Sequence, residues 1–184
     1  GHILAKLIQL KWRLRGKSMD DLRNLPEMTD PKHRAAMSIG TQIGSAAMFA
    51  QPMLLPLIIL QGVKATLKHG HGPESLSSYA ALGMIYAEAL GQPERGLALG
   101  QLALELTQRL QAKAIAGRVH HIYNAMVRHW KEPIRDCLDP LHETFRLCLE
   151  NGDFEYAAHA VCVGLGNAFE AGMDLAHLTN ELLE

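Results

Sequence analysis

Residues 75–110 read SLSSYAALGMIYAEALGQPERGLALGQLALELTQRL, and this stretch decides the fold. The GQP turn at 91–93 divides it into two segments in which apolar residues recur with helical spacing. Tyr79 belongs to a row of large residues on the first segment, whereas Gly96 and Gly100 lie on one face of the second. Because large side chains then face very small ones, we expect the two backbones to approach closely in an antiparallel helical hairpin.

The same stretch resembles a tetratricopeptide repeat, which places an aromatic residue, then Leu-Gly, then Tyr on its first helix. Here these are Tyr79, Leu82-Gly83 and Tyr86, and small residues follow on the second helix after a slightly longer loop. A hairpin of this kind leaves apolar surface uncovered and needs neighbours on both sides. We therefore expect one all-α domain over residues 1–184, a tetratricopeptide-like α-solenoid of antiparallel helical hairpins with about nine helices.

Helical periodicity continues on both sides of this central repeat, and no alternating stretch is long enough for a strand. The expected parts are an N-terminal helix and connector (3–30), an apolar helical hairpin (31–70), the best repeat (75–110) and further repeat helices (112–184) that end in a truncated helix over 175–183. Ser18 and Asp30-Pro31 are expected to begin helices, because Ser and Asp cap helix N-termini and Pro suits the first turn. The initial Gly1-His2 is typical of a cloned fragment, so the natural protein is expected to be longer.

Residues 35–63 contain no charged side chain, which raises the question of a membrane span. Pro52 and Pro56 would break such a helix in mid-course, so we expect two short buried helices and no membrane insertion. Gly40 and Gly44 share one face of the first of these helices. Small residues at this spacing predict close approach by a neighbouring helix.

Charge and cysteine content narrow the class of partner and the compartment. The formal net charge is -1 and the sequence pI is near 6.9, so no basic surface is expected to bind nucleic acid. Cys137, Cys148 and Cys162 lie in apolar helical runs without paired spacing. We expect them to be buried thiols of a protein in a reducing compartment, the cytoplasm.

The histidines are the residues most able to support chemistry. His120, His121 and His129 fall within one expected helix, where His121 and His129 roughly share a face. No HExxH or paired-cysteine motif accompanies them, so they are expected to be surface or half-buried residues, with a histidine-dependent metal or ligand site as an alternative. Nucleophile elbows, phosphate-binding loops and dinucleotide fingerprints are lacking in the sequence. The expectation for this segment is no catalytic, cofactor-binding or metal-binding residue.

Five residues are candidates for an interaction surface. A groove lined by Tyr79, Met84, Tyr86 and the region of Tyr123 is predicted to receive an extended or helical segment of a partner. Trp130, in the basic run 128–131, either forms a protein-binding hot spot or packs at a helix end.

A second class of interaction stays open alongside this groove. The apolar helix over 52–60 could form a two-fold interface, and the chain would then be a homo-oligomerisation domain.

Several short stretches together resemble the helical-repeat region of very large bacterial multidomain signalling proteins. They are 18–31 (SMDDLRNLPEMTDP), 51–52 (QP), 79–83 (YAALG), 100–104 (GQLAL), 129–131 (HWK) and 152–157 (GDFEYA). In that family a serine/threonine-kinase-like domain and a predicted AAA-type ATPase precede this region, and a GAF sensor and an output domain, commonly a histidine kinase, follow it. The resemblance implies a non-catalytic scaffold that docks flanking domains or a separate protein or peptide, with kinase and ATPase activity elsewhere in the full-length protein. His69-Gly70 departs from the family, in which Tyr-Gly is common, so no role is carried over for that aromatic residue.

Overall fold

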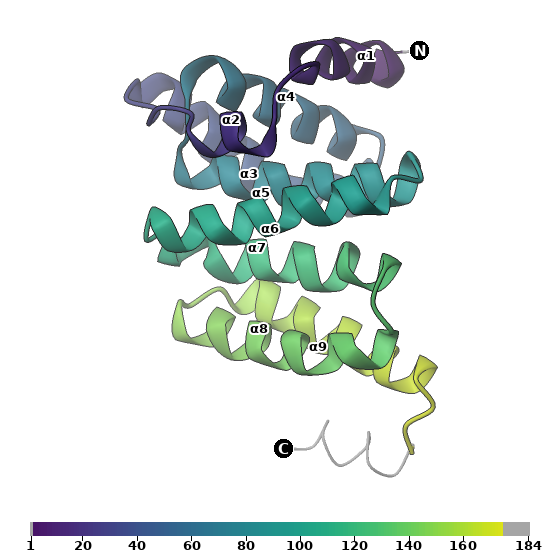
Figure 1. The fold of residues 1–184 in the computed structure, drawn as a ribbon. Helices are drawn as coiled ribbons and strands as arrows, with labels where there is room; N and C mark the ends of the chain where they lie inside the picture. Colours follow the sequence, from purple (N-terminus) through teal and green to yellow (C-terminus); the bar gives the residue numbers. More distant parts are fainter. Residues whose placement is uncertain (1, 175–184) are drawn as a thin grey trace.

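The computed structural model describes residues 2–174, and over this range the chain is all-α, as predicted (Figure 1). Its α-helices are α1 (His2–Leu14), α2 (Met19–Arg23), α3 (Pro31–Ala50), α4 (Leu54–His69), α5 (Pro73–Met84), α6 (Pro93–Arg109), α7 (Lys113–Met126), α8 (Leu138–Glu150) and α9 (Phe154–Glu170). No β-strand occurs within residues 2–174, where Glu27 and His71 form an isolated bridge. The helix predicted over 175–183 lies outside the described residues.

The helices form a succession of layers, from α1 at the top of Figure 1 to α8 and α9 at the bottom. The most extensive contacts join α5 to α6 and α8 to α9, and α7 packs on both α6 and α8. α3 packs on α4 and α5. The finer prediction, a tetratricopeptide-like solenoid, stays a prediction.

Two predicted helix starts are confirmed by their capping hydrogen bonds. The Asp21 N–H donates to Ser18 Oγ over 3.1 Å, and the Ser18 N–H donates to the Asp21 carboxylate over 2.7 Å. At α3 the Lys32 N–H donates to the Asp30 carboxylate over 2.8 Å. These side chains satisfy backbone donors that a helix start leaves without intrahelical partners.

The centre of the core is the hairpin of α5 and α6, where the predicted close approach of two backbones occurs. A Cβ added at Gly83 would lie 2.7 Å from the Gly96 carbonyl oxygen, and one at Gly96 would lie 2.7 Å from the Gly83 carbonyl oxygen. A Cβ at Gly100 would overlap the ring of Tyr123 on α7. Glycine at these positions therefore brings α5, α6 and α7 into direct contact.

Two helices end earlier than predicted. The first helix of the hairpin stops at Met84 and continues as a π-helical turn over Ile85–Ala89, in which the Leu90 N–H donates to the Ile85 carbonyl over 3.1 Å. α7 stops at Met126, and Arg128–Trp130 forms a separate 3-10 turn. A π-helical turn is wider than an α-helical turn, and a 3-10 turn is tighter. No residue pattern in the sequence marks either of them.

The uncharged stretch over 35–63 forms most of α3 and the first part of α4, two helices that pack on each other, and not a single long helix. The prediction that both helices are buried is wrong for α3, in which only Met37 and Ala47 are buried. The chain turns at Gln51, whose N–H donates to the Ala47 carbonyl over 2.9 Å. Among the described residues, no helix combines the length and the apolar character needed to cross a membrane.

Candidate functional site

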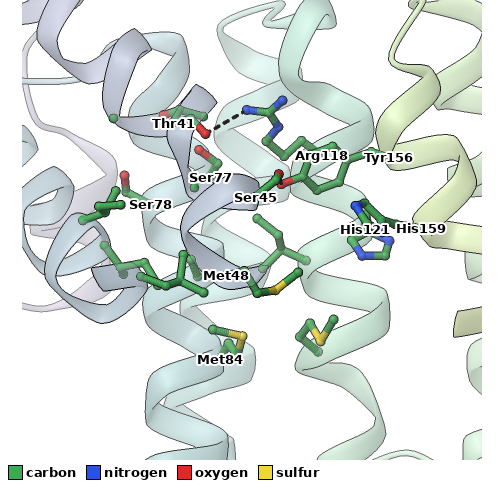
Figure 2. Close-up of a pocket in the computed structure, with 18 of the residues that line it drawn as sticks. Thr41, Ser45, Met48, Ser77, Ser78, Met84, Arg118, His121, Tyr156 and His159 are labelled. Atoms are coloured by element: carbon green, nitrogen blue, oxygen red, sulfur yellow. Dashed lines mark hydrogen bonds between the residues drawn. The ribbon is translucent and has the colours of Figure 1, made fainter. Parts of the chain in front are cut away.

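A cavity of about 170 Å³ lies where α3 and α4 face α7 and α9, with α5 behind it (Figure 2). Its lining runs from Gly40 on α3 to Val163 on α9, so it joins segments that are far apart in the sequence. The cavity has an apolar part and a polar end, and this mixture is typical of binding sites for small molecules and peptide side chains.

The apolar part is built from helices that the core already holds in place. Its walls are Leu55 and Ile58 of α4, Ala81 and Met84 of α5, and Ile122 and Met126 of α7, with Met48 of α3 at the edge. Met48, Met84 and Met126 bring three flexible thioether side chains to one cavity. Methionine adapts its shape to different apolar groups, which suits a wall that receives a ligand.

The glycines of α3 explain why space remains here. A Cβ at Gly44 would meet nothing within 4 Å, and a Cβ at Gly40 would meet only Ile58 Cγ2, at 3.9 Å. The prediction that these glycines admit a closely packed helix is therefore wrong. They face the cavity, where the lack of side chains leaves room instead of a backbone contact.

The polar end joins α7 and α9 to α3 through side chains. The Arg118 guanidinium stacks on the Tyr156 ring, with its central carbon 4.5 Å from the ring centroid, and donates to the Thr41 carbonyl over 3.3 Å. The Tyr156 hydroxyl lies 3.3 Å from Ser45 Oγ. Figure 2 shows these groups meeting across the cavity from three different helices.

His121 is the most deeply buried polar residue of the cavity, with 4% of its surface exposed. Its ring centroid lies 5.4 Å from that of Tyr156 and 5.8 Å from that of His159. Burial lowers the pKa of His121 to about 4, and the nearby His159 adds to the effect. The imidazole is therefore neutral at neutral pH.

Two buried nitrogens of this end have no hydrogen-bond partner among the described residues. They are His121 Nδ1 and Arg118 Nε. A buried polar group without a partner costs about 1–3 kcal/mol, so native proteins rarely leave one without a reason. No carboxylate of the described residues lies within 4 Å of Arg118 either.

The predicted interaction residues are divided by the structure. Tyr79, Tyr86 and Tyr123 are at most 5% exposed. Tyr79 packs on His71, Tyr86 on Arg95 of α6, and Tyr123 on Gly100 of α6. These tyrosines are core residues, and the prediction that they line an open groove needs correction. Met84 lines the cavity, and Trp130 is 43% exposed beside His129, away from the cavity lining.

The histidine prediction also changes. His129 lies in the 3-10 turn and not on α7, so it does not share a helical face with His121. Within residues 2–174, no group of three or more His, Cys, Asp or Glu is placed to hold a metal ion. The sequence predicts His121 to be at the surface or half-buried, whereas the structure buries it. Gly117 and Asn124 mark a buried face of α7, which packs on α8.

Cysteine burial was predicted correctly at two positions of three. Cys137 and Cys148 are buried, whereas Cys162 is exposed and lines the cavity. In the apolar segment 52–60, Met53 and Leu54 are exposed, but Ile59 and Leu60 belong to the core. Only the beginning of that segment is therefore free to contact another molecule.

Comparison with known proteins adds no name to this site. No family model matches the chain, and no curated protein or solved structure is significantly similar to it. The resemblance to multidomain signalling proteins therefore stays a prediction.

Proposed function

We propose that this chain is a non-catalytic helical scaffold for protein–protein or interdomain interaction, and that the cavity between α3 and α9 is its binding site. The observation that supports this most is the pair of buried, unpartnered nitrogens of Arg118 and His121 beside an apolar wall. Arg118 and His121 both line the cavity, so a polar group that enters it can pair with the Arg118 guanidinium while its apolar surface is buried against the wall. Together with the resemblance described above, this favours a docking module of a cytoplasmic multidomain signal-transduction kinase and ATPase.

The position of the cavity suits such a scaffold. α3 packs on α4 and α5, whereas its links to α7 and α9 are side-chain contacts at Thr41, Ser45 and Phe49. A partner that fills the cavity would contact α3 on one side and α7 and α9 on the other, and it would favour one distance between these helices. A ligand shifts an equilibrium when it binds two arrangements unequally, and this is how a docking event would pass along the stack.

Binding of the flanking domains to the purified chain tests the proposal. The ATPase and GAF domains that the resemblance implies on either side would be titrated into the chain, with calorimetry as the readout. Met84→Glu places a charge on the cavity wall, and we expect at least a tenfold loss of affinity, about 1.4 kcal/mol. Leu149→Glu changes an exposed leucine of α8 away from the cavity lining and is the matched control. Lack of binding to either flanking domain, or equal effects of the two variants, would contradict the proposal.

A homo-oligomerisation domain is the second candidate, and a specific surface favours it. Exposed apolar side chains gather along α3 and the start of α4, at Ile39, Ile43, Phe49, Met53 and Leu54. Contiguous exposed apolar residues mark interaction surfaces in soluble proteins. Light scattering over a range of concentrations distinguishes the candidates: dimers that Phe49→Ser together with Met53→Ser dissociates would favour the second, and a monomer at high concentration would reject it.

A further inference from the structure

We infer that the cavity binds a compact hydrocarbon group that carries a carboxylate, with the carboxylate at Arg118 and the hydrocarbon among the methionines. This inference rests on the proposed binding role of the cavity and specifies the chemistry of what enters it. The group can belong to a free organic acid or to the C-terminal residue of a partner chain, because both present a short apolar body next to a carboxylate.

The volume of the cavity limits the size of the hydrocarbon. A buried apolar cavity of about 150 Å³ accommodates benzene. The present cavity of about 170 Å³ therefore has room for a phenyl ring or a branched alkyl group of similar size. Its apolar part, with Leu55, Ile58 and Ile122 among its walls, offers van der Waals contacts to such a group.

The charge of Arg118 determines the polar group. A guanidinium has five N–H donors and stays charged at all pH values of interest. Arg118 uses one hydrogen bond, to the Thr41 carbonyl, while its Nε lacks a partner and no carboxylate of residues 2–174 is paired with it. Half-buried charges are normally paired, and a planar carboxylate matches the guanidinium better than any neutral group does.

His121 provides the second, independent observation. Its side chain lines the cavity, is more than nine-tenths buried and has an unpartnered Nδ1. A neutral imidazole has one N–H donor and one acceptor nitrogen. It can therefore offer one hydrogen bond to a polar group in the cavity without bringing another charge into the site.

The experiment compares hydrocinnamate, a phenyl ring on a short chain with a carboxylate, with its uncharged amide. Calorimetry is expected to show binding of the acid and at least a tenfold weaker binding of the amide, because a hydrogen bond between two charged groups is stronger than one to a neutral group. A second arm uses a tripeptide that ends in Phe, with a free or an amidated C-terminus. Binding of the free acid alone identifies a small molecule as the source, and tighter binding of the peptide identifies a chain terminus.

Two arginines allow a matched pair of variants, because each stacks on a tyrosine. Arg118 lies 4.5 Å from the Tyr156 ring centroid at the cavity, and Arg95 lies 4.6 Å from the Tyr86 ring centroid outside the cavity lining. We expect Arg118→Met to remove the preference for acid over amide and Arg95→Met to keep it. Gly44→Leu fills open space next to the cavity and is expected to abolish binding of both probes while the helical circular dichroism is retained.

Three results would overturn the inference: no binding of either acid, equal binding of acid and amide, or an unchanged preference in the Arg118→Met variant. These results are separate from a failure of the proposed function. Flanking domains that bind while the acids do not bind reject the carboxylate and keep the scaffold. Acids that bind while the flanking domains do not bind reject interdomain docking and keep the carboxylate site.

Discussion

The α5–α6 hairpin and the junction between α3 and α9 both contain glycines, but they use them in opposite ways. In the hairpin, Gly83 and Gly96 lack the side chains that would keep the two backbones apart, and each carbonyl oxygen lies 2.7 Å from the position that a Cβ on the other residue would take. At the junction, a Cβ on Gly44 would meet nothing within 4 Å. The backbones of α5 and α6 are therefore in direct contact, whereas α3 and α9 border a cavity.

The difference follows from how each helix is held. α5 and α6 are joined by the π-helical turn and a short loop, and within residues 2–174 they share the most extensive contact between two helices. α3 is held by α4 and α5 and reaches α9 through the Ser45–Tyr156 and Phe49–His159 contacts. Small residues permit close packing, but the topology decides whether a neighbouring helix takes the space. The closely packed hairpin stabilises the fold, and the looser junction leaves a cavity between α3 and α9.

The strongest test of this contrast is a methyl group added to the hairpin. In Gly83→Ala the Cβ would lie 2.7 Å from the Gly96 carbonyl oxygen, a backbone atom that no side-chain rotation can move away. Overpacking of this kind costs about 1–3 kcal/mol, and the rigid neighbour places Gly83→Ala near the upper limit, about 3 kcal/mol. Urea denaturation followed by circular dichroism measures the change in the free energy of unfolding.

Gly44→Ala is the matched variant at the junction. It adds the same methyl group in the middle of a helix where nothing lies within 4 Å. Alanine favours the helix over glycine by about 0.5–1 kcal/mol, so this variant is expected to be as stable as the parent chain or slightly more stable. Equal losses for the two variants would mean that both regions are closely packed, and the contrast would not hold.

Much of the fold was predictable because helical periodicity and helix starts are local signals. The all-α class, the hairpin in residues 75–110 and the caps at Ser18 and Asp30 depend on residues a few positions apart. The π-helical turn over Ile85–Ala89 was not predictable, since it depends on how the end of α5 meets α6. The spacing of apolar residues is enough to predict a helix, whereas irregular turns at its ends depend on the helices packed against it.

The cavity depends on long-range contacts, and for this reason the sequence points to only two of its residues as candidates: Met84 for the groove and His121 for the alternative ligand site. Met84 was recognised from the face of its helix, but the arrangement that surrounds it includes Ser45, Arg118 and Tyr156 from three helices. Nothing in the sequence pairs Ser45 with Tyr156, which are 111 positions apart. The sequence places Tyr79 and Tyr86 at a surface because a row of aromatic residues marks one face of a helix but does not show what covers that face.

The second test uses acid, because His121 lies at the junction and not in the hairpin. Its pKa is lowered from 6.5 to about 4, so between these pH values the unfolded chain binds a proton that the folded chain does not bind. Stability is thus complete above pH 6.5 and falls as the pH approaches 4, by about 2–3 kcal/mol for this residue. The lowered pKa values of His71 and His120 add to the loss in the same direction.

The contribution of His121 is isolated by replacing it. His121→Gln removes the titrating group, and we expect its free energy of unfolding to change less between pH 6.5 and 4 than that of the parent chain. His142 is an exposed histidine on α8, so His142→Gln is the control and is expected to keep the parent slope. Parallel pH profiles for the parent and His121→Gln would show that this imidazole titrates normally in the folded chain.

The smallest effect expected is chemical and leaves the fold intact. Cys162 is exposed at the cavity, whereas Cys148 is buried against Gly117 and burial raises the pKa of its thiol to about 11. Thiolates are the reactive form of cysteine, so a thiol reagent is expected to label Cys162 first in the folded chain. Mass spectrometry of peptides from briefly labelled protein identifies the modified residue, and Cys162→Ser is expected to remove the fast phase. Labelling of Cys148 at the same rate would require α7 and α8 to separate readily, and the closely packed region would then extend no further than the α5–α6 hairpin.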